Sequence, residues 1–114
     1  FSPGYSLHNQ AATFIEEGKV PEAIQKLKEA VEANPENPFF YIQLGELYRE
    51  SGQENAAIGY FQKAIKAAPL LKAGYEALAL LYKEKGERKK ALAVLVEYLK
   101  FKKKQGPLVP FTDI

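Results

Sequence analysis

The sequence predicts an all-α fold, an α-solenoid of three antiparallel helix-turn-helix repeats. Three observations predict it. The sequence matches itself when it is shifted by about 34 residues, a period typical of helical repeat proteins. Apolar residues recur at helical spacing inside each repeat. Glycine or proline stands where each helix must end. The repeats span about 4–37, 38–71 and 72–105, and the whole chain is expected to form one domain.

The self-match rests on residues of similar size at equivalent places in the three repeats. One place holds glycine throughout, one holds alanine, one holds an aromatic ring and one holds a large apolar side chain. In order, these are Gly18, Gly52 and Gly86; Ala23, Ala57 and Ala91; Phe14, Tyr48 and Tyr82; and Leu27, Phe61 and Leu95.

Each repeat is predicted to form two helices. In the second repeat, Tyr41, Leu44, Gly45 and Tyr48 share one helical face, and Ala57, Ile58, Phe61, Ala64 and Ile65 share the face of the next helix. The same reasoning in every repeat gives helices near 5–17, 20–34, 38–51, 54–67, 72–85 and 88–104. Short connections make neighbouring helices antiparallel.

The predicted helix ends follow from local chemistry. Asn37 is a helix-capping residue, and Pro38 fits the first helical position. Gly18 and its two equivalents follow the first helix of each pair, where glycine readily adopts the left-handed conformation of a C-cap. Asn34-Pro35 and Ala68-Pro69 end the second helices, because proline cannot donate the next backbone hydrogen bond.

The sizes of the apolar residues indicate how the helices meet. Gly45 and Ala57 are small, which allows the two helices of a pair to approach closely. Ala30 and Ala64 are small where a second helix must admit the following repeat. Tyr98 takes that place in the third repeat. We therefore predict that the array ends there, with an exposed end to cover.

The composition argues against catalysis. There is no cysteine, His8 is the only histidine, and no glycine-rich loop precedes a helix. A metal site, a catalytic triad and a phosphate-binding loop therefore lack their usual residues. No enzyme activity, metal or cofactor is expected. No apolar run is long enough to cross a bilayer. The chain begins at Phe1 and lacks methionine, so we interpret it as a fragment or a processed chain.

These residues resemble the tetratricopeptide repeat over about 100 residues. The second repeat fits best, with Tyr41, Leu44, Gly45, Tyr48, Gly52, Ala57, Phe61, Ala64 and Pro69 at the signature places. The third repeat departs from the pattern at Tyr98 and Lys103, and the first has Gln10 where leucine is usual. The resemblance implies a protein-interaction scaffold, and it leaves the partner open.

The resemblance also implies that the first helix of each pair lines a concave groove. Phe39, Ile42 and Leu80 would anchor a peptide or helix of a partner protein there. The alternative is that the next repeat partly covers Phe39 and Leu80. The expected groove residues are His8, Asn9, Ala12, Phe39, Ile42, Gln43, Glu46, Arg49, Ala73, Glu76, Ala77, Leu80 and Lys83, with Ile15 on the same side.

One subgroup of the family holds the C-terminal carboxylate of chaperones with five polar residues. The matching places here carry His8, Ala12, Gln43, Ala73 and Ala77, none of them the usual side chain. A carboxylate bound without its donors would be left unpaired. The sequence therefore argues against this form of recognition.

The charges are distributed unequally along the chain. Residues 1–57 hold four Lys/Arg and nine Asp/Glu, a net charge of −5, whereas residues 58–114 hold twelve and five, a net charge of +7. This asymmetry would steer an acidic partner or favour head-to-tail self-association. The simpler explanation is solvated helix faces with lysines near helix C-termini.

Two basic runs support a further alternative, binding of nucleic acid or a membrane surface. They comprise Lys83, Lys85, Arg88, Lys89 and Lys90, then Lys100, Lys102, Lys103 and Lys104. Stacking aromatics are scarce in both runs, so the sequence favours a protein partner.

The segment 106–114 differs from the repeats. Gly106-Pro107 ends the last helix, and Leu108, Val109, Phe111 and Ile114 are apolar. The hypotheses are that it lies extended on its own chain or on a neighbouring copy, or that it begins a further domain.

Overall fold

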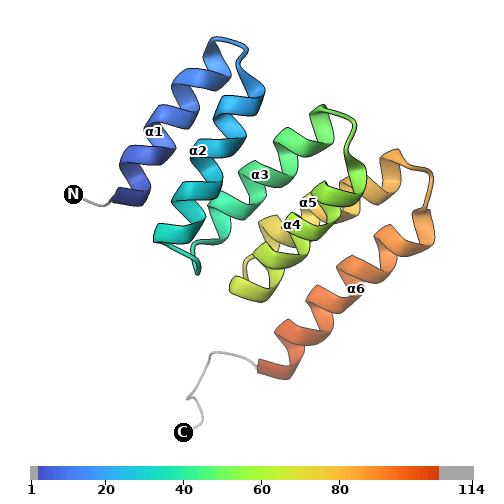
Figure 1. The fold of residues 1–114 in the computed structure, drawn as a ribbon. Helices are drawn as coiled ribbons and strands as arrows, with labels where there is room; N and C mark the ends of the chain where they lie inside the picture. The colour runs from blue at the N-terminus through green and yellow to red at the C-terminus, as the bar shows by residue number, and fades with distance from the viewer. Residues whose placement is uncertain (1–2, 106–114) are drawn as a thin grey trace, which may run out of the picture.

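The part of the chain that the structure describes folds into six α-helices arranged as three consecutive antiparallel pairs (Figure 1). The computed structural model describes residues 3–105. The helices are α1 (Pro3–Glu16), α2 (Val20–Ala33), α3 (Pro38–Glu50), α4 (Glu54–Ala67), α5 (Lys72–Glu84) and α6 (Arg88–Gln105). The predicted all-α solenoid is therefore confirmed, and helix ends differ from the expected ones by at most two residues. The segment 106–114, for which docking was hypothesised, lies outside the described residues.

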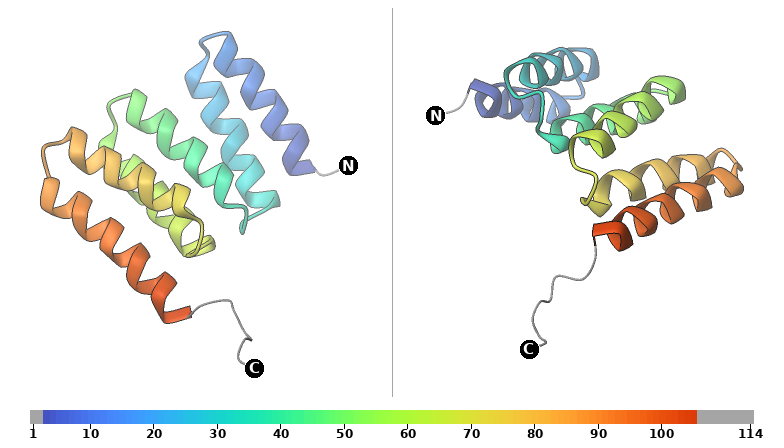
Figure 2. Two further views of the ribbon diagram at one scale, coloured as in Figure 1. Left: turned by 180° about the vertical axis from the view of Figure 1, so that it is seen from behind. Right: turned by 90° about the horizontal axis from the view of Figure 1, so that it is seen from below.

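The three pairs stack one after another (Figure 2, right). Helices pack on their neighbours in the sequence, and α3 also packs against α5. The principal-axis extents are 55, 41 and 19 Å, so the molecule is a flat slab. Such packing buries a continuous core only because each pair covers the apolar side of the next.

The expected signals do end the helices. Gly18, Gly52 and Gly86 have φ values of 76°, 79° and 80° in the turns inside the pairs. A side chain is disfavoured at these values, which explains the glycines. Asn37 caps α3, because its Oδ1 accepts a 2.9 Å hydrogen bond from the Phe39 amide.

Two tyrosines fix the connections between pairs. The Tyr41 hydroxyl donates a 2.7 Å hydrogen bond to the Pro35 carbonyl, and the Tyr75 hydroxyl donates a 2.9 Å bond to the Pro69 carbonyl. Each bond satisfies a carbonyl just beyond the end of α2 or α4. The equivalent tyrosines thus tie each of these loops to the helix that follows it.

The close approach of α3 and α4 depends on Gly45. A Cβ atom added there would overlap the Phe61 ring. Phe61 is itself buried, with 1% of its surface exposed. The expectation that small residues allow the helices of a pair to meet is therefore confirmed for the second pair.

The buried side chains form two clusters. The first core comprises Ala11, Ala23, Leu27, Ala30, Phe40, Leu44 and Leu47. The second core comprises Ala57, Phe61, Tyr75, Leu78, Ala79, Leu81 and Val94. Tyr48 packs against both, so one side chain of α3 joins the two halves.

The two ends of the stack differ in polarity. On α1, Gln10 and Thr13 are exposed where α3 has the buried Leu44 and Leu47. On α6, Leu92 and Leu99 remain exposed. Polar residues therefore finish the N-terminal end, whereas the C-terminal end keeps apolar surface.

Candidate peptide-binding face

The exposed sides of α1, α3 and α5 form one face, here called the first-helix face. Because the repeat period is constant, equivalent positions of the three helices lie on this face. In the view from behind, α3 and α5 run side by side in front of α4 (Figure 2, left). The structure places all the expected groove residues on these three helices, namely His8, Asn9, Ala12, Phe39, Ile42, Gln43, Glu46, Arg49, Ala73, Glu76, Ala77, Leu80 and Lys83.

Each helix of this face exposes one large apolar side chain. Ile15 on α1 is 41% exposed, Phe39 on α3 is 55% exposed and Leu80 on α5 is 47% exposed. The alternative of cover by the next repeat is therefore incomplete at best, because about half of the surface of Phe39 and Leu80 remains in water. Covering exposed apolar side chains of this size with a partner is energetically favourable.

The three side chains are separate anchor points. Phe39 begins α3, and Leu80 lies seven residues further along the equivalent positions of α5. A rise of 1.5 Å per residue separates them by about 10 Å along the helix axes. One interhelical step of about 9 Å adds to this across the face. An extended segment of roughly four or five residues would span that distance.

Ile42 behaves differently from Phe39. It is half-buried and packs against the second core. Ala77 of α5 is also half-buried against this core. Ile42 therefore contributes mainly to the contact between α3 and α5, and only its outer part is available to a ligand.

Two charged residues of the face, Arg49 and Glu76, have ion-pair partners within the chain. Arg49 Nη1 donates hydrogen bonds of 3.2 and 3.1 Å to the two carboxylate oxygens of Glu84, which joins α3 to α5. Glu76 lies 3.7 Å from Lys72 in an ion pair along α5. Arg49, expected from sequence to line the groove, thus pairs with a carboxylate of its own chain.

Gln43 lies on α3, about one helical turn after Phe39. Its Oε1 atom is buried, and it accepts no hydrogen bond from the described part of the chain. A buried acceptor without a donor costs free energy. A ligand could reach this oxygen only if the Gln43 side chain turned outward, because the atom is buried.

His8 packs against Phe40 of the first core. Its ring centroid lies 5.5 Å from that of Phe40, tilted by 32°. Asn9, Ala12, Glu46 and Lys83 are exposed, and Ala73 is half-buried. Within residues 3–105, no group of three or more His, Asp or Glu side chains is placed to hold a metal ion.

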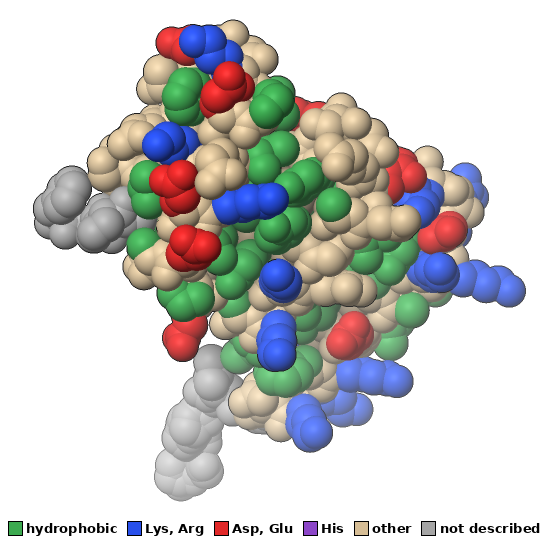
Figure 3. All heavy atoms as spheres, in the orientation of Figure 1, with side chains coloured by type: hydrophobic (Ala, Val, Ile, Leu, Met, Phe, Trp, Pro, Cys, Tyr) green, Lys and Arg blue, Asp and Glu red, His purple; other side chains and the backbone are tan. Residues whose placement is uncertain are grey.

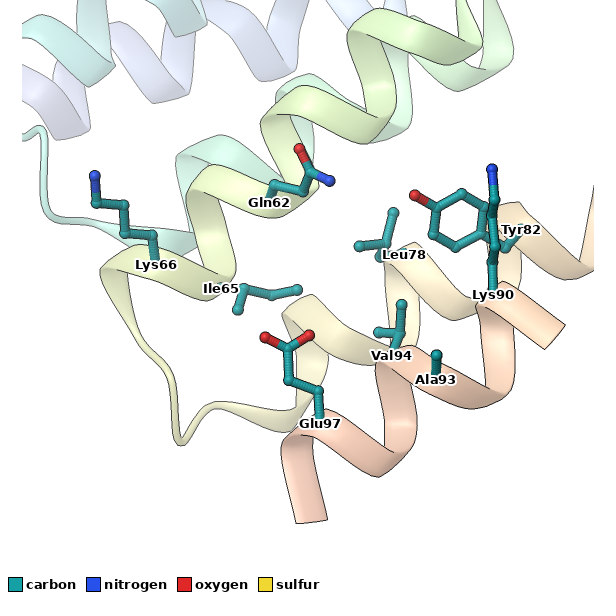
Figure 4. Close-up of a pocket in the computed structure, with 9 residues that line it drawn as sticks. All are labelled: Gln62, Ile65, Lys66, Leu78, Tyr82, Lys90, Ala93, Val94 and Glu97. Carbon is teal, nitrogen blue, oxygen red and sulfur yellow. The ribbon is translucent and has the colours of Figure 1, made fainter. Parts of the chain in front are cut away.

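A hollow lies between α4 and α6, on the side of the slab opposite the first-helix face. It was not predicted from the sequence. Its volume is about 520 Å³, and its lining residues are Gln62, Ile65, Lys66, Leu78, Tyr82, Lys90, Ala93, Val94 and Glu97. Ile65 of α4, Leu78 of α5 and Val94 of α6 point toward one another at its floor (Figure 4). The sequence could not predict it, because its width depends on how far α4 and α6 diverge.

An equivalent hollow of about 280 Å³ separates α2 from α4. Beside it, the rings of Tyr48 and Tyr60 stack at 5.4 Å. Lys28 Nζ lies 5.8 Å from the Tyr48 ring, and Lys63 Nζ lies 5.2 Å from the Tyr60 ring. A hydrogen bond to Tyr48 raises the pKa of Lys28, and burial raises the pKa of Tyr60. The Lys28–Tyr48 contact stabilises the packing of the first pair on the second, whereas the Tyr48–Tyr60 stack and the Lys63–Tyr60 contact lie within the second pair.

None of the described helices has both the length and the apolar character needed to cross a lipid bilayer. Space-filling atoms show basic side chains gathered at the lower right, over α6 (Figure 3).

The comparisons with known proteins agree with this architecture. A family model described as tetratricopeptide repeat matches residues 14–71. The crystal structure of MamA is similar with a TM-score of 0.78 and 23% identity, over 91% of this chain and 61% of that chain. A second structure of MamA protein gives the same score and identity over 97% and 62%. The chain thus spans about three fifths of the MamA chains.

A third neighbour is the second tetratricopeptide repeat domain of Spaghetti (RPAP3), bound to the HSP90 peptide SRMEEVD. Its TM-score is 0.74 with 16% identity, over 85% of this chain and 90% of that chain. No curated protein sequence matches the chain.

Proposed function

Because the chain belongs to the tetratricopeptide repeat family, we propose that it is a non-enzymatic interaction module that binds a peptide or helix of a partner protein on its first-helix face. The observation that carries the proposal is the exposure of Ile15, Phe39 and Leu80, one on each helix of this face. The module would act as a scaffold or adaptor, through non-covalent binding alone.

The proposed face is largely preformed. The ion pair between Arg49 and Glu84 and the packing of Ile42 hold α3 against α5 without a ligand. A rigid face loses little conformational entropy when it binds. The apolar anchors would then supply affinity, and Gln43 would fix the backbone of the bound segment after its side chain turns outward.

The HSP90 peptide bound by the RPAP3 neighbour is not expected to bind this chain in the same way. The places that hold a terminal carboxylate in such domains carry Ala12, Ala73 and Ala77 here, together with His8 and Gln43. Alanine donates no side-chain hydrogen bond to a carboxylate. We propose that the bound segment lies within the partner's chain, away from its C-terminus, and is mainly apolar.

Selection of random peptides on the folded chain tests the proposal. The selected peptides are measured by fluorescence anisotropy against wild type, Phe39→Glu and Leu80→Glu. A buried glutamate without a partner disfavours binding. Each substitution should therefore raise the Kd about tenfold or more, which corresponds to about 1.4 kcal/mol.

Leu70→Glu is the matched control. Leu70 is 51% exposed and lies in the loop between α4 and α5, outside the proposed face. Ile42→Glu is avoided, because it would also disturb the second core. Failure to select a binder, or binders that tolerate both substitutions, would contradict the proposed function.

A further inference from the structure

The last helix carries an apolar row that the fold leaves uncovered. Leu92 is 63% exposed, Val96 is 38% exposed and Leu99 is 59% exposed. Their spacing places them on one side of α6, within about one fifth of a turn of one another. We call this row, with its basic neighbours, the C-terminal face. It lies outside the first-helix face.

The repeat itself shows that the places of Leu92 and Leu99 are normally covered, whereas Val96 stands where α2 and α4 carry the exposed Lys28 and Gln62. Ile58 and Ile65 of α4 are the equivalents of Leu92 and Leu99, and both are half-buried against the second core, where α5 packs on α4. The corresponding Ile24 and Val31 of α2 are half-buried against the first core. The third repeat keeps the apolar residues but lacks a covering helix in the part of the chain that the structure describes.

Tyr98 limits what can cover this face. Its equivalents Ala30 and Ala64 are 0% and 1% exposed, where the following helix approaches closely. A Cβ atom placed on Gly74 would lie only 3.6 Å from that of Ala64. The Tyr98 ring stands in this place and packs on Tyr75 at 5.1 Å. A further helix could not approach α6 as closely as α5 approaches α4.

Unpaired cations surround the apolar row. At 100° per residue, Lys89 and Lys100 lie along one edge of the row, Arg88 near its start and Lys103 near its end. No described carboxylate lies within ion-pairing distance of these four residues, whereas Lys90 pairs with Glu87. Lys102 and Lys104 add further charge, and Glu97 is the only carboxylate on α6. The face is therefore complementary to a surface of negative charge.

A second copy of the chain is a poor match for this face. The N-terminal end of the stack presents Gln10 and Thr13, which would not bury the leucines. Two C-terminal faces would bring their cations together, which costs free energy.

We propose that the C-terminal face docks on an anionic lipid surface. Leu92, Val96 and Leu99 enter the boundary between head groups and acyl chains, and Arg88, Lys89, Lys100 and Lys103 lie among the negatively charged head groups. A lipid surface adapts to the Tyr98 ring, because it requires no close backbone approach. Three apolar side chains give weak and reversible binding, so electrostatic attraction is needed as well.

Co-sedimentation of the full chain with vesicles tests the proposal. We expect binding to vesicles of 30% phosphatidylserine and 70% phosphatidylcholine, and little binding to pure phosphatidylcholine. Binding should weaken at least tenfold in 0.5 M salt, because salt screens the lysines. The pair Leu92→Ser and Leu99→Ser, and separately the pair Lys100→Glu and Lys103→Glu, should each weaken it at least tenfold.

Two control variants match these changes elsewhere. Leu70→Ser removes an exposed leucine from the loop before α5. Lys66→Glu reverses the charge of an unpaired lysine on α4. Both should bind as wild type does, and circular dichroism verifies that every variant is folded.

Several results would overturn the proposal. These are absence of binding to the anionic vesicles, equal binding to neutral vesicles, or unchanged binding in both α6 variants. Oligomers that the leucine substitutions dissociate would assign the face to a second copy. Binding that appears only in a chain ending at Gln105 would assign it to the segment 106–114.

Discussion

Replacement of Gly45 by alanine should destabilise the domain, although alanine is the better helix former. A methyl group at this position overlaps the Phe61 ring, and the crowding of a packed core typically costs about 1–3 kcal/mol. The higher helix propensity of alanine than of glycine offsets about 1 kcal/mol of this cost. The expected net loss is therefore about 1 kcal/mol, which lowers Tm by about 4–8 °C in a domain of this size.

The other repeats suggest how to restore the loss. At the positions equivalent to Gly45 and Phe61, the first repeat has Ala11 and Leu27, and the third repeat has Ala79 and Leu95. Phe61→Leu alone should also destabilise, because it leaves a cavity beside Gly45. The double variant Gly45→Ala/Phe61→Leu installs the pair of the other repeats. It should be more stable than the sum of the single effects predicts, by about 1 kcal/mol.

Urea unfolding followed by circular dichroism measures these free energies, and Gly59→Ala serves as the control. Gly59 also lies inside a helix, but nothing stands within 4 Å of a Cβ atom placed there. That substitution should stabilise the domain by up to about 1 kcal/mol. If Gly45→Ala stabilised the domain as Gly59→Ala does, or if the double variant were additive, the argument from packing against Phe61 would be refuted.

Three further predictions concern polar contacts. Asn37→Ala should cost about 1 kcal/mol in urea unfolding, because the Phe39 amide loses its cap; an unchanged midpoint would exclude a role for the cap. A double-mutant cycle of Arg49→Gln and Glu84→Gln should give a coupling of roughly 0.5 kcal/mol that salt reduces, because the pair is partly exposed; a salt-independent value would contradict this. Burial raises the pKa of Tyr75, so the folded chain retains this proton where the unfolded chain loses it. Stability should then fall as the pH rises above about 10, and less steeply in Tyr75→Phe, as urea midpoints from pH 9 to 11 would reveal.

The helices were predictable because their ends are set by local chemistry. Pro69 restricts the backbone, Gly52 permits the positive φ that the turn requires, and Asn37 needs only an amide two residues later. The pairing of helices also followed from sequence, since small residues such as Gly45 repeat at a fixed period. These signals lie within one or two repeats of the chain.

The surface was less predictable because it depends on contacts between repeats. Ile42 and Phe39 look alike as apolar residues of one helix, but only Phe39 remains largely exposed. Arg49 was expected to be available to a ligand, and Glu84 occupies it from 35 residues away. The periodic acidic residues Glu50 and Glu84 were a signal that could have suggested this pair. The choice between them requires the distance between α3 and α5.

The position of Tyr48 governs how the molecule would come apart. Because its ring belongs to both cores, each half gains from the order of the other, and the chain is expected to unfold as a single cooperative unit. If Tyr48 were replaced by serine, the two cores would lose the ring that they share but keep the other contacts of α3 with α4 and α5. Unfolding would then be less cooperative, and amide exchange would report opening free energies that differ more between the two halves.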